Sequence, residues 1–381
     1  MIDMLTRIHV DNFRCMVNFE CRLGPRQLLL GPNGAGKSTL FDVLSLLRDF
    51  CIAGVPPDRP HPAPRFGGGS RTRWQDVPGQ TFELDVSGNG GMYNFSLVMD
   101  SWGNPERPRV ILEEVRFDGE TIFRFEMGEV HLFNDRAEAK AFYPFDWHRS
   151  ALATITERND NTKLTWFKRW LGGLLHVQPD PWAMVGIANQ EADRPDQHLA
   201  NFADWYRHLR QEMDDHEYIR DLADVMDGFV TMRLEAAGEG RREIKVRMMA
   251  AGNGTGPSRE PEYLLSELSE GQRVLIGLYA VLHFALKPGA TICFDEPDNF
   301  IALREVLPWL MKVLDRTEET DSPAQVLIVS HHPELLNRMS FKEGLVLDRP
   351  SGRHTRARPF EDPAQTGLTA SELIARGWER E

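Results

Sequence analysis

The segment Gly31-Pro-Asn-Gly-Ala-Gly-Lys37-Ser38 has the spacing of a phosphate-binding loop. An apolar run, Leu28 to Leu30, precedes it and an apolar helical pattern follows it, as such a loop requires. The glycines let backbone N–H groups turn towards phosphate oxygens, the Lys37 ammonium can reach the β- and γ-phosphates, and the Ser38 hydroxyl can bind Mg²⁺. The residues expected to contact the nucleotide are Asn33, Gly34, Ala35, Gly36, Lys37, Ser38 and Thr39.

A second apolar strand pattern, which begins near Ala290, ends in the adjacent carboxylates Asp295 and Glu296. At such a strand end one acid can hold the Mg²⁺ shell while its neighbour lies beside an attacking water. We assign the metal to Asp295 together with Ser38, and the general-base role to Glu296. An apolar run followed by Asp-Glu is common by itself, but its combination with a phosphate loop favours a catalytic role.

A third buried-strand pattern, Val326 to Val329, is followed by Ser330 and the pair His331-His332. Strands of this kind deliver polar groups to the same edge of a sheet as the two carboxylates. A histidine there can hydrogen-bond the γ-phosphate, and we expect His331 to do so. We expect His332 to lie in solvent or to contact the site only indirectly.

The segment from Leu265 to Arg273 opens a strongly apolar helix. Ser269 stands at the N-cap position with Gln272 three residues later, which is the pattern of a capping box. A helix N-terminus that carries Ser and Gly is also an anion site. Two interpretations therefore stay open: a helix cap, or a clamp on the γ-phosphate of a nucleotide bound elsewhere.

Together these motifs resemble those of ABC-type ATPases. The phosphate loop (Walker A), the signature LSEGQ at residues 268–272, the Asp-Glu strand (Walker B) and the switch His331 occur in the order of that family. DEPDNF and VSHHPELL look like the AAA-family ATPases grouped with the SMC, RecF and OLD proteins. The opening MLTRIHVDNFR also resembles that group, in which the arginine, here Arg14, lies near the phosphates. Residues 51–260 match only in general layout.

The resemblance implies a head-to-head homodimer that encloses two ATP molecules and their Mg²⁺. Each nucleotide would be held by the Walker motifs of one subunit and the signature of the other. The signature residues that would act on the facing nucleotide are Ser269, Glu270, Gly271 and Gln272.

The sequence departs from the family pattern in two places. After Glu296, transporters and SMC proteins carry an Asp-bearing loop that follows a Leu, whereas here Pro297 is followed by Asp298 and Asn299. Neither of these two receives a secure role. A Q-loop glutamine is also not identifiable, with Gln75 and Gln80 as the candidates.

The elements around the motifs predict an α/β fold, a P-loop ABC-ATPase head. Residues 1–135 form the N-terminal ATPase lobe, with the phosphate loop and an antiparallel β-meander between Thr81 and Phe133. Residues 136–228 form a helical insertion that lacks the heptads of a long coiled coil. Residues 229–381 form the C-terminal lobe, in which strand patterns over 229–236 and 243–249 precede an alternation of helix and strand. Residues 51–79 are rich in Pro, Gly and Arg and predict a long surface loop.

The composition is that of a globular protein, with 41% hydrophobic and 27% charged residues among 381. A net charge of −13 argues against a generally basic nucleic-acid coat protein. Local contact with phosphate remains open, although Arg-rich loops on acidic proteins are more often solvated. Two clusters could make it: Arg65, Arg71 and Arg73, and Arg353, Arg356 and Arg358.

The cysteines and the apolar runs indicate an intracellular protein. Cys15, Cys21, Cys51 and Cys293 form no C-x-x-C pair and are expected to be reduced, packed thiols. No run reaches the roughly 18 apolar residues needed to span a bilayer, and the N-terminus lacks the centre of a signal peptide. The expected location is the cytoplasm, with no membrane partner.

Three functions are compatible with these motifs. A transporter ATPase subunit is disfavoured because Ser269 follows Gly31 by 238 positions, much further than the transporter pattern allows. A DNA-repair ATPase of the RecF or SMC kind would use the arginine clusters to bind DNA or RNA. We favour an ATPase that dimerises on ATP and drives or regulates a separate effector protein, such as an antiviral defence effector, because no nuclease pattern follows His331.

Overall fold

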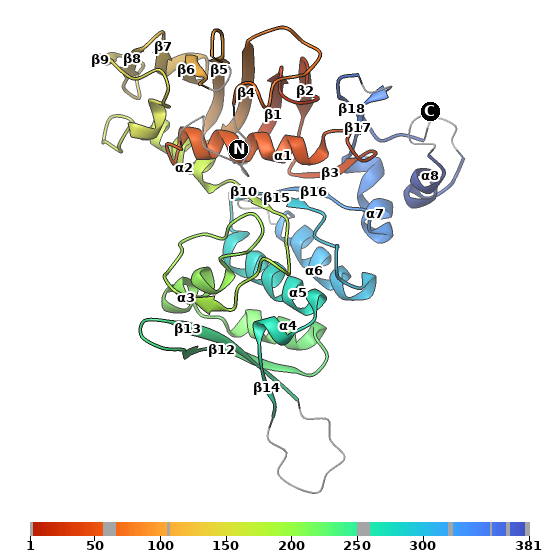
Figure 1. The fold of residues 1–381 in the computed structure, drawn as a ribbon. Helices are drawn as coiled ribbons and strands as arrows, with labels where there is room; N and C mark the ends of the chain where they lie inside the picture. Colours follow the sequence, from red (N-terminus) through yellow and green to blue (C-terminus); the bar gives the residue numbers. More distant parts are fainter. Residues whose placement is uncertain are drawn as a thin grey trace, which may run out of the picture.

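The computed structural model describes residues 3–55, 66–104, 107–249, 260–318, 323–350, 353–362 and 366–377. Its elements form successive layers (Figure 1): an eight-stranded antiparallel sheet, a layer of helices, a six-stranded, mainly parallel sheet, further helices, and a small antiparallel sheet. The predicted α/β class is confirmed. Among the described residues, no helix combines the length and the apolar character needed to cross a bilayer.

The large antiparallel sheet has the strand order β2-β1-β4-β5-β6-β7-β8-β9. Two of its hairpins turn at Asn89-Gly90 and Asp118-Gly119, where all four residues have positive φ angles, as two-residue hairpin turns require. The predicted meander is therefore present. The strands are β1 (Met4–Asp11), β2 (Phe19–Arg22), β4 (Gly79–Gly88), β5 (Gly91–Asp100), β6 (Arg109–Phe117), β7 (Glu120–Glu126), β8 (Glu129–Phe133) and β9 (Ala139–Pro144).

The second sheet has the order β10-β15-β16-β3-β17-β18 and separates two hydrophobic cores. Within β3, Leu28 and Leu30 face one core and Leu29 faces the other. Strands that are buried on both faces read as continuous apolar runs, which is why β3, β15 and β16 were recognisable in the sequence. The bounds of the six strands are β3 (Arg26–Leu30), β10 (Leu175–Val177), β15 (Thr291–Asp295), β16 (Gln325–Val329), β17 (Gly344–Asp348) and β18 (Arg356–Pro359).

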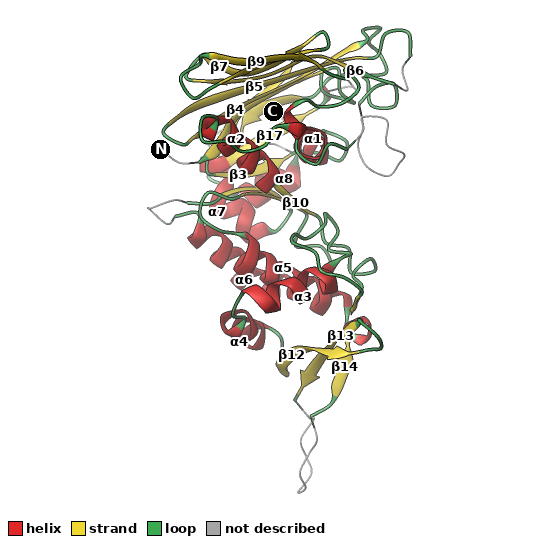
Figure 2. Cartoon of the chain, turned by 90° about the vertical axis from the view of Figure 1, so that its left-hand side faces the viewer, coloured by secondary structure: helices red, strands yellow, loops and turns green. Residues whose placement is uncertain are grey.

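Helices cover both faces of this sheet. Helix α1 (Lys37–Cys51) lies between the two sheets and, with α2 (Thr162–Gly173), fills the core beneath the antiparallel sheet (Figures 1 and 2). The remaining helices pack in the other core. They are α3 (Phe202–Glu212), α4 (His216–Val225), α5 (Glu270–Ala280), α6 (Leu303–Arg316), α7 (Pro333–Glu343) and α8 (Ala370–Arg376).

The prediction that residues 136–228 are helical was only partly right. Helices α2, α3 and α4 are present, but β9 extends the meander, β10 joins the parallel sheet beside β15, and β11 (Ile187–Ala188) pairs with β13 (Arg242–Met248). These strands depend on partners distant in the chain, and β10 and β11 are too short to show a period of two. The pair β12 (Phe229–Ala236) and β13 was predicted, and β14 (Glu262–Leu264) adds to it. Residues 56–65, within the predicted surface loop, lie outside the described residues.

Candidate nucleotide-binding site

Three neighbouring parallel strands bring the predicted motifs to one edge of the sheet. Strand β3 ends at the phosphate loop, β15 ends at Asp295, and β16 is followed by Ser330 and His331. Asp295 lies opposite Val329 in the register, and the backbone N–H of Glu296 donates to the Val329 carbonyl at 2.9 Å. In open α/β sheets, ligands bind beyond the carboxyl ends of the strands. The location predicted for the site is therefore the usual one for such a fold.

The phosphate loop depends on three glycines in conformations that other residues rarely adopt. The φ angles of Gly31, Gly34 and Gly36 are 129°, 79° and 104°. A Cβ atom on Gly31 would also lie 2.0 Å from the backbone oxygen of Leu347. Asn33, Gly34 and Ser38 are exposed, Thr39 is half-buried and Ala35 is buried, so one side of the loop faces outward at the start of α1.

The Lys37 ammonium is held against the loop. Its side chain donates to the carbonyl oxygens of Gly31 at 2.7 Å and Pro32 at 3.2 Å, and the residue is only 6% exposed. Burial lowers the pKa of Lys37, against the opposing attraction of Glu296 and Asp295. A phosphate would give this poorly solvated cation a charged partner, which is the condition under which ionic hydrogen bonds are strongest.

The back of the phosphate loop is fixed by a residue that carries no motif. The Thr355 hydroxyl donates to the Ala35 carbonyl at 2.8 Å, and its backbone N–H donates to the Cys15 carbonyl at 2.9 Å. A Cβ on Gly36 would lie 3.0 Å from the Cys15 sulfur and 3.1 Å from the Thr355 hydroxyl. Sequence reasoning missed Thr355, because its link to the loop exists only in the folded chain.

Arg14 lies beside the first turns of α1. Its Nη1 donates to Asp42 Oδ2 at 2.5 Å, and Asp42 is one turn beyond Ser38 on that helix. The arginine has a positive φ of 50°, and its backbone N–H donates to the Ser70 carbonyl. The guanidinium is paired with Asp42, so the contact of Arg14 with the phosphates stays a prediction.

Asp295 is suited to hold a cation. The residue is 1% exposed, and neither carboxylate oxygen has a hydrogen-bond partner among the described residues. Burial of a charge without a partner is energetically costly, so a cation beside Asp295 would be favourable. In nucleotide sites Mg²⁺ binds oxygen ligands, such as a carboxylate, a hydroxyl and the substrate phosphates. Asp295 and the exposed Ser38 therefore fit the predicted metal position.

Glu296 begins a turn with unusual backbone geometry. Its φ is 49°, and Phe300 in the same turn has a φ of 71°. The Asn299 side chain donates to Glu296 Oε2 at 2.8 Å, so the carboxylate is oriented by a residue to which the sequence assigned no role. Such strained conformations persist where the surrounding structure enforces them, which is frequent at active sites.

The two histidines after β16 differ. His331 is exposed, so its ring is accessible to a bound phosphate. His332 is buried, and its Nε2 contacts the Leu303 carbonyl at 3.0 Å. Of the two alternatives expected for His332, its burial excludes a position in solvent, and its ring instead contacts the start of α6, downstream of Glu296.

The structure also distinguishes the two Q-loop candidates, Gln75 and Gln80. The Gln80 amide donates to the Asn12 carbonyl at 3.0 Å and accepts from the Gly67 N–H at 2.8 Å, so this buried side chain holds loop backbone in place. Gln80 is therefore not available to a nucleotide. The Gln75 Oε1 is buried with no partner among the described residues, so Gln75 remains the candidate.

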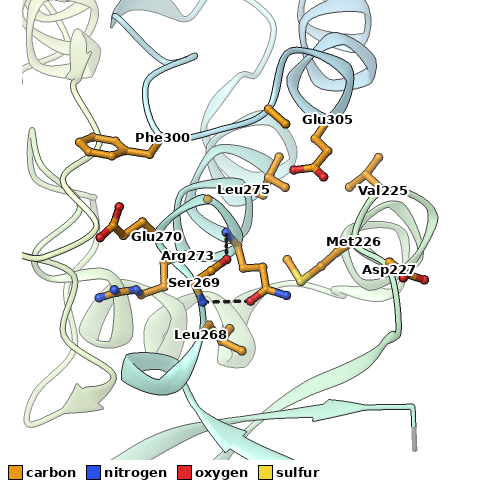
Figure 3. Close-up of a pocket in the computed structure, with 13 residues that line it drawn as sticks. Val225, Met226, Asp227, Leu268, Ser269, Glu270, Arg273, Leu275, Phe300 and Glu305 are labelled. Atoms are coloured by element: carbon orange, nitrogen blue, oxygen red, sulfur yellow. Dashed lines mark hydrogen bonds between the residues drawn. The ribbon is translucent and has the colours of Figure 1, made fainter. Parts of the chain in front are cut away.

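The signature forms a separate pocket (Figure 3). Ser269 accepts a hydrogen bond from the Gln272 N–H at 3.3 Å, and Gln272 Oε1 accepts from the Ser269 N–H at 3.0 Å, which confirms the capping box. The pocket has a volume of about 650 Å³ and is lined mainly by the signature, by the end of α4 and by residues around Phe300. A Cβ on Gly271 would lie 2.8 Å from the Phe300 backbone oxygen, so the helix end and the turn after Glu296 touch.

The signature pocket and the phosphate loop are distinct places in one chain. Of the described residues that line the pocket, none belongs to residues 31–38, and neither Glu296 nor His331 takes part. Glu270 and Glu305 line it as well, so the features in the pocket that favour an anion are the positive end of α5 and the side chain of Arg273.

A family model described as "AAA domain, putative AbiEii toxin, Type IV TA system" matches residues 28–337. The chain belongs to this AAA-domain family. The matched range begins in β3 and ends in α7, so it contains the phosphate loop, the signature, the two acids and His331. The AAA family that the motifs indicated is therefore confirmed.

The chain is also similar to a curated protein in sequence and to a solved structure in fold. It is 46% identical over 44 residues to an "OLD nuclease" from Thermus scotoductus, a match that covers 12% of this chain and 8% of that protein. It shares the fold of a structure titled "Crystal structure of the SmcHead bound to the C-winged helix domain of ScpA", with a TM-score of 0.55 and 11% identity over 93% of this chain and 98% of that one. The P-loop ATPase head fold predicted from the motifs is thus confirmed.

Proposed function

We propose that this protein hydrolyses ATP in a site that is completed by a second copy of itself. The observation that carries the proposal is the separation of the two anion-binding features. The phosphate loop and the acids lie at one sheet edge, while Ser269 opens into a pocket that none of residues 31–38 lines. A second subunit that faces the first would supply the missing signature.

In the proposed site each residue has one task. Backbone N–H groups of the loop and Lys37 bind the phosphates, and Asp295 and Ser38 would hold Mg²⁺, which would neutralise developing charge on the phosphates. Glu296, oriented by Asn299, accepts a proton from the attacking water, and His331 hydrogen-bonds the γ-phosphate. The partner's Ser269 and Gly271 would contact the same phosphate with the end of their helix.

We further propose that the ATP-driven dimer acts on a separate effector protein, and that it works as an intracellular regulatory or defence ATPase. The family description names a toxin and a toxin–antitoxin system, and the SMC head of similar fold is bound to a domain of another protein. The net charge of −13 counts against extensive contact with a nucleic-acid backbone.

The variant Glu296→Gln tests hydrolysis directly. It should bind ATP with wild-type affinity, while kcat falls about 10² to 10⁴-fold, because removal of a positioned base costs about that much. Lys37→Ala is the contrasting variant, which should weaken ATP binding itself. Steady-state phosphate release and calorimetric titration separate the two effects. Wild-type turnover by Glu296→Gln would refute the assignment.

A further inference from the structure

A buried histidine stands between α1 and the carboxylate assigned to the metal. His176 lies on β10, is 4% exposed, and pairs in the register with Cys293, two residues before Asp295. Its Nε2 is 3.7 Å from Asp295 Oδ2, and its Nδ1 is 3.3 Å from the Ser45 hydroxyl on α1. The three side chains thus link the helix that follows the phosphate loop to the end of β15.

Several polar atoms in this cluster have no other partner. The Nε2 of His176 and both oxygens of Asp295 are buried without a hydrogen bond among the described residues. A separation of 3.7 Å is too long for a hydrogen bond, but it leaves no room for a bridging water. Because buried polar groups are nearly always paired, a shift of less than 1 Å that joins these two atoms would satisfy both.

The Ser45 hydroxyl and the Asp295 carboxylate together favour one tautomer of the His176 ring. If the Ser45 hydroxyl donates to Nδ1, the hydrogen of the neutral ring lies on Nε2 and points to Asp295. The opposite tautomer would turn a lone pair towards a buried carboxylate, which is unfavourable. The arrangement therefore favours an Nε2–H donor facing Asp295 Oδ2.

We propose that His176 is a positioning residue, which holds Asp295 Oδ2 by an Nε2–H hydrogen bond and so leaves Oδ1 to the metal. Carboxylates that bind metals are commonly oriented by such outer hydrogen bonds, and loss of one typically weakens the metal about 10 to 100-fold. Ser45 follows Ser38 by seven residues on α1, or about two turns. One helix thereby sets both proposed metal-binding groups, Ser38 directly and Asp295 through His176.

This inference rests on the proposed metal role of Asp295, and the experiment separates the two. The experiment measures the affinity of the full chain for a non-hydrolysable ATP analogue by calorimetry, once in Mg²⁺ and once in EDTA. The ratio of these two affinities is called the Mg²⁺ gain. His176→Phe keeps an aromatic ring that can pack on Phe41 but removes the donor. It should reduce the Mg²⁺ gain about 10 to 100-fold and leave the affinity in EDTA unchanged.

Two further variants test the donor itself. His176→Gln can place its amide nitrogen near the position of Nε2 and should retain most of the Mg²⁺ gain. Ser45→Ala keeps the histidine but removes the tautomer bias, and should reduce the gain by less than His176→Phe does. This variant also tests the inference without altering β10, should His176→Phe fail to fold.

The outcomes are distinguishable. If Asp295→Ala abolishes the Mg²⁺ gain while His176→Phe and Ser45→Ala keep it, the inference about His176 is wrong and the proposed metal site stands. Equal losses in His176→Phe and His176→Gln, with equal falls in melting temperature, would show that His176 only packs. If Asp295→Ala retains the Mg²⁺ gain, the metal assignment fails and the inference fails with it.

Discussion

Glu296 is held in place from two directions. Its backbone N–H is bonded to β16, and its carboxylate accepts from Asn299 at 2.8 Å. The first bond fixes the position of the residue and the second fixes the direction in which its side chain points. A general base works only within hydrogen-bond reach of its proton, so the orientation by Asn299 is expected to affect the rate more than ATP binding.

Asn299→Ala should therefore lower kcat by a factor of about 10 and leave KM for ATP unchanged. The loss should be smaller than the 10² to 10⁴-fold expected for loss of the base, because the carboxylate remains present. Asn299→Asp should be worse, since it replaces the donor with a like charge. The check is steady-state kinetics of both variants beside Glu296→Gln. A kcat for Asn299→Ala equal to the wild-type value would show that this hydrogen bond is incidental.

At the scale of single residues, the sequence predicted residues that belong to motifs and missed those that support them. Lys37, Asp295 and His331 follow recognisable strands, so they could be assigned from the chain alone. His176 and Thr355 act through contacts with residues far away in the sequence, and no local pattern marks them. Asn299 was close enough to suggest, but only the turn after Glu296 shows that its side chain folds back.

One buried carboxylate ties together the helices around the signature pocket. Asp221 on α4 accepts from His283 at 2.9 Å and from Lys312 on α6 at 2.5 Å. His283 lies in η3 (Val281–Ala285), a π-helical turn that continues α5. Because α4 ends at the signature pocket and α5 begins there, this cluster fixes two of the pocket walls relative to each other.

Asp221→Asn should lower the free energy of unfolding by about 1 to 3 kcal/mol at neutral pH, because bonds to a charged acceptor become neutral ones. Burial by itself raises the pKa of Asp221, but the hydrogen bonds from Lys312 and His283 outweigh it and lower that pKa. A carboxyl with a lowered pKa stabilises the fold above its unfolded value of about 3.9, and the effect is lost as the pH falls through the folded value.

Urea unfolding at several pH values is the check. The difference between wild type and Asp221→Asn should be largest near pH 7 and should shrink below about pH 4. Asp224→Asn, an exposed carboxylate on the same helix, is the matched control and should stay within about 0.5 kcal/mol of wild type. A difference that does not change with pH would contradict the ionic role of Asp221.

Elements with a long, regular pattern were predicted well, and elements that depend on distant partners were not. Strands β6, β7 and β8 lie within the predicted meander, because alternation and turn residues define them locally. Strand β10 has only three residues and exists because β15 lies beside it. It also carries His176, so the missed strand and the missed positioning residue have the same cause.

The whole molecule presents two halves of one proposed site on different parts of its surface. The position of Ser269 as an N-cap, predicted from the sequence, is confirmed. Within one subunit, however, a serine that only caps α5 has the same structure as one that also contacts a facing γ-phosphate. Only the arrangement of the complete fold, with the signature pocket lined by none of residues 31–38, favours the clamp. The sequence suggested this composite site through resemblance to a family of dimeric ATPases.

The most direct test is the mass of the Glu296→Gln protein in solution with and without ATP, measured by sedimentation equilibrium. With ATP and Mg²⁺ the protein should double from its monomer mass of 43.5 kDa, because the nucleotide is bound but not consumed. Addition of Ser269→Arg to the same chain should leave ATP binding intact and keep the protein monomeric, since a bulky cation blocks the facing γ-phosphate. An ATP-bound Glu296→Gln protein that stays monomeric, or a doubly substituted protein that dimerises equally well, would contradict the composite site.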